Sequence, residues 1–145
     1  MGSKEVLGII VSIYSDEVMH DIFHGKSVHA SLADGERTAL EKGDRIFFYD
    51  SGRTRCIMGE AVIASMAFDE AESVFDDLGP SLYIGRDDFA RYVSSLPGGD
   101  KSVLRLVYFR DAVLYANPVK CNMAIGENGT YMTAEVSAKI AKDNV

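Results

Sequence analysis

Two histidines, His20 and His24, stand four residues apart in the sequence HDIFH. On a helix this spacing places both imidazoles on one face, as in the zinc-binding helices of metallohydrolases, with Asp21 between them. On a helical wheel with about 100° per residue, the apolar stripe that begins at Val18 is centred roughly 150° away from the two histidines. The pattern therefore predicts a solvent-exposed helix face and no metal site, with His29 as the only further imidazole in the chain.

The two cysteines, Cys56 and Cys121, are far apart and form no C-x-x-C pair, so they predict free buried thiols. A cysteine hydrolase needs an imidazole beside its thiol, and all three histidines lie within residues 20–29. The chain also lacks a phosphate-binding loop, a dinucleotide-binding loop and a G-x-S-x-G elbow. No cofactor and no catalytic residue is predicted on these grounds.

The net charge of −7 argues against a broad cationic surface for nucleic acid. Eight acidic residues and only two arginines fall between positions 69 and 100, so the remainder of the chain is close to neutral. A bound polyanion would therefore lie away from that segment, near Lys26, Arg45, Arg53 and Arg55.

Hydrophobic patterning and turn residues predict the elements that position these groups. Apolar and β-branched runs predict strands at 6–14, 27–32, 45–49, 55–68 and 103–115, of which 45–49 and 55–68 form a hairpin. Helices are expected to begin after caps at Ser15, Asp69, Asp87 and Thr133. A loop is expected at 33–37, a strand break at Asn117-Pro118, and a hairpin turn at Asn128-Gly129 between 123–125 and 130–132.

Because the sequence contains no repeat or linker, it predicts one domain that spans residues 1–145, with an acidic helical insertion at about 69–97. The chain is 47% hydrophobic and 26% charged, and no stretch approaches the roughly 18 apolar residues of a membrane helix. No secretory signal is evident, so a cytoplasmic, non-membrane protein is expected. The fold class expected is α+β, with short helices around a strongly curled sheet.

The segment from Gly25 to Ile63 contains a Gly-Lys pair, the run GDRIFFYDSG at 43–52, two arginines at 53 and 55, and GEAVI at 59–63. This order of motifs resembles the PUA-like superfamily, and within it the ASCH and EVE domains and uncharacterised archaeal proteins. Residues 106–109 and Asn117-Pro118-Val119 resemble the late strand and turn of the same domains. The resemblance implies a β-pseudobarrel of about six strands with four helices, and a cleft beside the barrel that binds RNA or a modified base.

The resemblance also implies which side chains bind the ligand. Gly25 and Lys26 match the Gly-Lys positions, Tyr49 and Ser51 match the F-Y-x-S positions, and His29 stands where ASCH domains carry charged residues. Lys26 would then contact a phosphate, Tyr49 would stack on a base, and Ser51 would hydrogen-bond to a base edge. Arg53 and Arg55 are candidates to clamp a phosphate.

The function predicted is a binding module for RNA or a nucleotide-like small molecule, with the oligomeric state left open. One alternative is a small hydrolase of modified nucleosides, because some ASCH-like proteins hydrolyse such substrates; Lys26 and Glu60 would then be the catalytic pair. Another alternative is a protein-interaction module that uses the acidic helices between positions 69 and 96.

Overall fold

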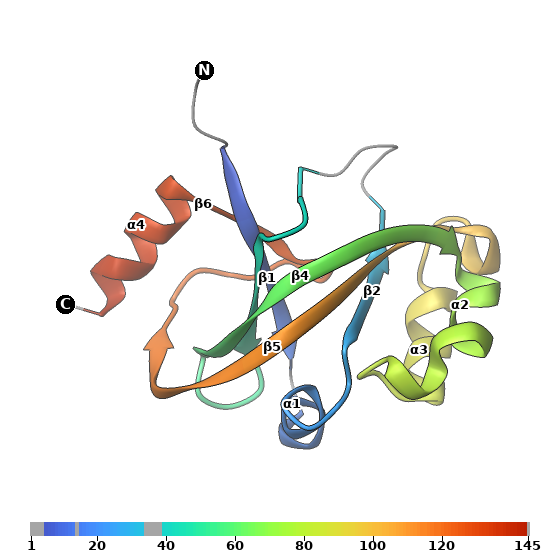
Figure 1. The fold of residues 1–145 in the computed structure, drawn as a ribbon, viewed down its shortest axis with the longest axis horizontal. Helices are drawn as coiled ribbons and strands as arrows, with labels where there is room; N and C mark the ends of the chain where they lie inside the picture. The colour runs from blue at the N-terminus through green and yellow to red at the C-terminus, as the bar shows by residue number, and fades with distance from the viewer. Residues whose placement is uncertain (1–4, 14, 34–38, 145) are drawn as a thin grey trace.

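The computed structural model describes residues 5–13, 15–33 and 39–144. Figure 1 shows a curled sheet with α2 and α3 together at one end and α4 at the other. The strands are β1 Val6–Ile13, β2 Val28–Leu32, β3 Arg45–Asp50, β4 Cys56–Glu70, β5 Val103–Lys120 and β6 Thr130–Thr133. The helices are α1 Asp16–Ile22, α2 Ala71–Leu78, α3 Arg86–Ser94 and α4 Ala134–Asp143, with short 3-10 helices at Gly79–Ser81 and Gly99–Lys101.

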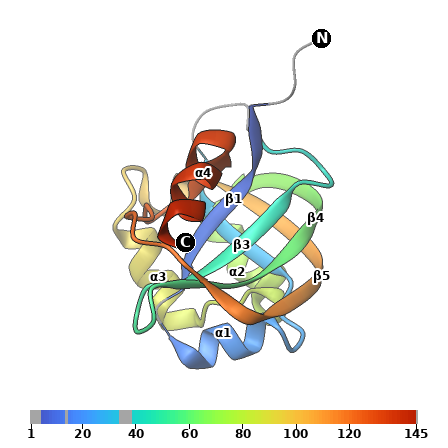
Figure 2. The same ribbon diagram turned by 90° about the vertical axis from the view of Figure 1, so that its left-hand side faces the viewer.

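The strands form one mixed sheet in the order β2-β5-β4-β3-β1-β6. Only β1 and β3 pair in parallel, while the other neighbours are antiparallel. The long strands β4 and β5 carry several register shifts where they pair, and such bulges bend and twist a sheet. As a result the sheet curves round on itself, as Figure 2 shows, without closing. The described residues thus form the predicted α+β fold, a strongly curled sheet of six strands with four α-helices around it.

The curl of the sheet encloses a hydrophobic core that α1 covers at one end. Alternate residues of β4, from Ile57 to Ile63, are buried, as expected for a strand with one face on a core. Phe48 is central in this core because its ring meets the edges of Phe23, at 5.6 Å, and Phe109, at 5.3 Å. Two further apolar clusters fix the remaining helices: one lies between the sheet and α2 and α3, and the other lies under α4.

Two predicted caps are confirmed, because Ser15 accepts a hydrogen bond from the Val18 amide and Thr133 accepts one from the Val136 amide. The predicted caps at Asp69 and Asp87 are wrong. Glu70 and Gly85 occupy those N-cap positions, without a side-chain cap, and Asp69 still belongs to β4. The pairing of β4 with β5 continues to Glu70 and so outweighs the local capping signal.

The predicted break at Asn117-Pro118 is also wrong, because β5 continues to Lys120. Pairing of β5 with β2 stops at Tyr108, so the distal part of β5 has β4 as its partner strand. A proline is compatible with such an edge segment when its missing N–H would have faced outward. The edge position of this segment therefore accounts for Pro118 within the strand.

The turn at Gly129 forms, with φ of 95° and a hydrogen bond from its amide to the Gly126 carbonyl, but the predicted hairpin does not. Residues 123–125 form no strand, and β6 pairs instead with β1. The turn signal was local, whereas the partner of β6 is set by a long-range contact. Most of the predicted 33–37 loop and the end of the first predicted strand at position 14 lie outside the described residues.

None of the helices formed by the described residues has both the length and the apolar character of a membrane span.

Candidate functional site

A cleft of about 420 Å³ lies at the open seam of the curled sheet. Because β6 pairs with β1 only as far as Ile10, the end of β1 pairs with no further described strand on that side, and its residues line the cleft together with those of β2. Helices α1 and α3 and the turn before β6 complete the walls. The lining residues are Ser12, Ile13, Ser15, Val18, residues 28–31, Tyr83, Ile84, Asp88, Arg91, Tyr92, Ser95 and Glu127.

His29 is the most unusual group in this cleft. Its side chain is 7% exposed, its Nδ1 is hydrogen-bonded to the Tyr83 hydroxyl, and the two rings stack with centroids 5.5 Å apart. Burial, followed by the charge of Arg105, lowers the pKa of His29 to about 3, so the imidazole is neutral at pH 7. Its Nε2 is buried and has no hydrogen-bond partner among the described residues.

Ser31 lies two residues further along the same strand, on the same face as His29. Its side chain is 2% exposed, and its Oγ is likewise buried without a partner in the described part of the chain. A buried polar atom without a partner costs about 1–3 kcal/mol. Two such atoms next to one cleft are candidate hydrogen-bond partners for a bound molecule.

The Tyr92 hydroxyl bridges the seam beyond these residues. It accepts a hydrogen bond from the Leu32 amide at 2.7 Å and donates one to Asn128 Oδ1 at 2.5 Å. Burial raises the pKa of Tyr92, and burial likewise raises that of Tyr83, so both phenols stay protonated at neutral pH. Tyr92 therefore links β2 to the turn before β6, where the sheet itself is open.

Replacing Tyr92 with phenylalanine is expected to lower the free energy of unfolding by about 1–3 kcal/mol, because the Leu32 amide and Asn128 each lose a partner. Urea unfolding measures this change. Tyr108→Phe is the matched control, since that ring is partly buried in an apolar cluster and no hydrogen bond to its hydroxyl is found within the described residues. Equal stability of wild type and Tyr92→Phe would show that the bridge does not hold the seam.

The charged side chains of the cleft lie on its α3 side and at Glu127. Arg91 is the only cation among the described residues that line it, and its guanidinium forms an ion pair with Asp88 at 2.6 Å. The interior therefore presents neutral polar groups and aromatic rings. Such a lining is suited to an uncharged heteroaromatic ligand rather than to a string of phosphates.

Of the seven residues predicted to bind the ligand, His29 lines the cleft and the other six do not. Tyr49 is 6% exposed and packs in the cluster under α4 with Ile57 and Cys121. Burial raises the pKa of its hydroxyl. Tyr49 therefore lies outside this cleft, and its predicted stacking on a base stays a prediction.

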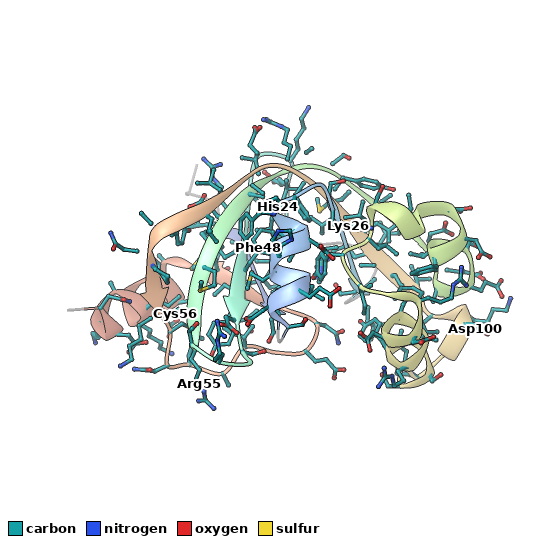
Figure 3. The ribbon with its side chains drawn as sticks, turned by 90° about the horizontal axis from the view of Figure 1, so that it is seen from below. His24, Lys26, Phe48, Arg55, Cys56 and Asp100 are labelled. Carbon is teal, nitrogen blue, oxygen red and sulfur yellow. The ribbon has the colours of Figure 1, made fainter. Side chains whose placement is uncertain are left out.

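The turn between β3 and β4 carries three of the remaining predicted residues. The Ser51 amide donates a hydrogen bond to the Ile13 carbonyl, Arg53 forms an ion pair with Asp16 at 3.0 Å, and Arg55 has a φ of 56°. Gly25 has a φ of 123°, a value that favours glycine, in the turn that follows α1. In Figure 3, Lys26 and Arg55 are seen on opposite sides of α1, so the two cations lie apart in that view.

Glu60, predicted as the catalytic partner of Lys26 in the hydrolase alternative, has other contacts. It accepts a hydrogen bond from the Tyr115 hydroxyl at 2.8 Å and lies 3.4 Å from Arg45 Nε. Neither Lys26 nor Glu60 lines the cleft. The catalytic pair of Lys26 and Glu60 therefore stays a prediction, and neither residue belongs to this cleft.

His20 and His24 are exposed, as their helix face predicts, and their rings stack 3.8 Å apart. The described residues contain no group of three or more histidine, cysteine or acidic side chains arranged to hold a metal ion.

Several cleft residues carry no signal in the sequence. Tyr92 falls within the predicted helix after Asp87 but in no motif, and Tyr83 and Glu127 lie in connections without a motif. Ser31 carried a usable signal, since a serine in the middle of a predicted buried strand needs a hydrogen-bond partner.

Comparison with known structures identifies the fold. A mutant form of the ASCH protein from Zymomonas mobilis matches with a TM-score of 0.73 and 11% identity, covering 97% of this chain and 98% of that one. The ASCH structure from the same organism gives 0.69 and 13%, covering 94% of each chain. A DUF984 protein from Enterococcus faecalis V583 gives 0.56 and 15%, covering 78% of this chain and 86% of the other.

The fold is thus that of the ASCH structures from Zymomonas mobilis. The chain belongs to the family described as "Domain of unknown function (DUF365)", which matches residues 6–134. No curated protein matches this sequence. The predicted resemblances to EVE domains and to archaeal proteins stay predictions.

Proposed function

We propose that this chain is a binding module that holds a nucleobase, as a nucleoside or as one nucleotide of RNA, in the cleft between β1 and β2. The observation that carries the proposal is the pair of buried polar atoms, His29 Nε2 and Ser31 Oγ, that lack partners among the described residues. A ligand with hydrogen-bonding groups on its edge would satisfy both atoms and recover the cost of burying them.

The remaining lining suits a flat heteroaromatic ring. Tyr83 and Tyr92 offer aromatic surface, and Ile13, Val18 and Ile84 offer apolar contact. Bases are commonly recognised by stacking on aromatic side chains together with hydrogen bonds to their edges. The cleft volume of about 420 Å³ also falls within the range of about 300–1,000 Å³ typical of small-molecule sites.

Similarity to ASCH domains supports RNA as one source of the base. A phosphate backbone would need cations, and Lys26, Arg53 and Arg55 lie outside the cleft lining. Contacts to a chain would therefore be made outside the cleft, while the cleft itself holds one base. An RNA ligand would show an affinity that falls steeply with salt, whereas a free nucleoside would not.

Calorimetric titration with a nucleoside panel tests the proposal. The panel contains the four common ribonucleosides and N4-acetylcytidine, each also presented within a short oligoribonucleotide. At least one member should bind, and His29→Phe should weaken that binding about tenfold or more, because the ligand loses a charge-neutral hydrogen-bond partner. His24→Phe, which changes an exposed imidazole, is the matched control.

Ser31→Ala separates binding from folding. Removal of a buried hydroxyl that has no partner in the described structure should leave the free protein as stable as wild type or more so, while binding weakens about tenfold. Failure of every panel member to bind would refute the proposed function. Release of acetate from N4-acetylcytidine would instead favour the hydrolase alternative.

A further inference from the structure

We infer that the ligand occupies the position of a further strand in the seam and is recognised by hydrogen bonds to main-chain groups. The Ala30 amide and carbonyl are the principal contact. This inference rests on the proposed function and adds how the base is recognised: through a hydrogen-bond donor and an adjacent acceptor on its edge, which the four common nucleobases all carry.

The pairing of β2 with β5 determines where the Ala30 main chain points. The Phe109 amide donates to the Ser27 carbonyl, and the Ala33 amide donates to the Val103 carbonyl, so odd-numbered residues of β2 bond to β5. In an antiparallel pair the intervening residues direct their N–H and C=O away from the partner strand. Ala30, which lies opposite Leu106, therefore presents both groups to the seam.

Both neighbours of Ala30 on this edge are already engaged. Val28 forms a parallel bridge with Leu82, and the Leu32 amide donates to the Tyr92 hydroxyl. Ala30 lies between them and lines the cleft. It is therefore the position on the outer edge of β2 at which a ligand, rather than another element of the described chain, meets the backbone.

The opposite wall of the seam repeats the arrangement. The Ile13 carbonyl accepts a hydrogen bond from the Ser51 amide, so Ile13 faces β3. Alternation then directs the main-chain groups of Ser12 towards the seam, beyond the last residue that pairs with β6, Ile10. Ser12 also lines the cleft. Two strand edges thus face one cavity, each with one amide and carbonyl.

The short length of this open edge favours a base over a peptide. The bridge at Leu82 blocks one end of β2 and the Tyr92 hydroxyl blocks the other, which leaves the single position Ala30 between them. An added peptide strand needs several consecutive main-chain pairs. A planar base needs only one donor and one acceptor on its edge.

Matched nucleoside pairs test this inference. The pairs are uridine with 3-methyluridine, guanosine with 1-methylguanosine, adenosine with N6,N6-dimethyladenosine, and cytidine with N4,N4-dimethylcytidine. In each pair the second member lacks the donor that stands next to an acceptor on the Watson–Crick edge, although 1-methylguanosine keeps its 2-amino group. For whichever base binds, we expect the alkylated partner to bind about tenfold or more weakly, because the Ala30 carbonyl is left without a donor.

Ala30→Pro tests the protein side, because proline removes the amide proton and is compatible with an outward-facing position on an edge strand. It should weaken binding about tenfold, whereas Ala30→Gly, which retains the amide, should not. Should Ala30→Pro fail to fold, the nucleoside pairs decide the question with wild-type protein alone.

The outcomes distinguish the two proposals. If a nucleoside binds but affinity is equal within every pair, the inferred hydrogen bonding to the Ala30 main chain is overturned and the proposed function is left intact. Absence of binding by all of these nucleosides would overturn both. Binding of acetyl-trialanine amide as tightly as the best nucleoside would show that the seam accepts a peptide and would overturn the assignment to a base.

Discussion

Replacing Phe48 with alanine is expected to lower the free energy of unfolding by about 3–5 kcal/mol, close to the limit that a small domain tolerates. The Phe48 side chain is 0% exposed in the core enclosed by the sheet. It joins α1 to β5 through edge contacts with Phe23 and Phe109. Alanine removes the whole ring and leaves a cavity among rigid strands that cannot collapse to fill it.

The same substitution should disturb the cleft, because Val18 of α1 and the N-cap residue Ser15 line its wall. In Figure 3 Phe48 lies beside α1, against the helix that it supports. Urea unfolding followed by circular dichroism measures the loss. Phe68→Ala is the matched control, since that ring is 43% exposed and should cost less than about 1 kcal/mol. Similar losses for the two variants would contradict the packing described for Phe48.

Lowering the pH from about 6.5 towards 3 is expected to destabilise the fold by about 1 kcal/mol per pH unit through His29 alone. Burial and the nearby Arg105 charge lower the pKa of His29 from 6.5 to about 3. Between these two values the unfolded chain holds a proton on this imidazole and the folded chain does not. Protons therefore favour unfolding. The stability that depends on a neutral His29 imidazole is fully present above pH 6.5 and is lost as the pH falls towards 3.

The comparison with His29→Gln isolates this contribution from the titrating carboxyl groups. Urea unfolding between about pH 7 and pH 4 should show a steeper fall in stability for wild type than for this variant. His24→Gln removes an exposed imidazole and should keep the steep wild-type slope. Parallel curves for wild type and His29→Gln would mean that the His29 imidazole is protonated as readily in the folded protein as in the unfolded chain.

Much of the fold could be predicted because its signals are local. The hairpin of β3 and β4 follows from two apolar runs around a short turn, and it forms as predicted. The caps at Ser15 and Thr133 depend on a hydroxyl and an amide only three residues apart. The resemblance to PUA-like domains also rests on motifs within single strands and turns, and the fold it implies is confirmed.

Local signals failed where a distant strand competed for the same residues. Asp69 and Glu72 match a capping box, yet Asp69 remains in β4, paired with Leu104, and Glu72 bonds to Lys101 instead. Thr130 follows a strong turn dipeptide, yet its strand partner is Ile10, at the other end of the chain. Pairing with an existing sheet buries more surface and satisfies more main-chain groups than a local turn does.

Local patterns of residue types indicated the α+β class of the fold, most of its strands and the exposed positions of His20 and His24. The place where a ligand would meet the protein depends instead on long-range strand pairing. The cleft joins Ser12, Ala30, Tyr92 and Glu127, which are far apart in the chain, at a seam that exists because β6 covers only part of β1. An open seam depends on how far each strand pairs with its neighbour, and no local pattern of residue types records that extent.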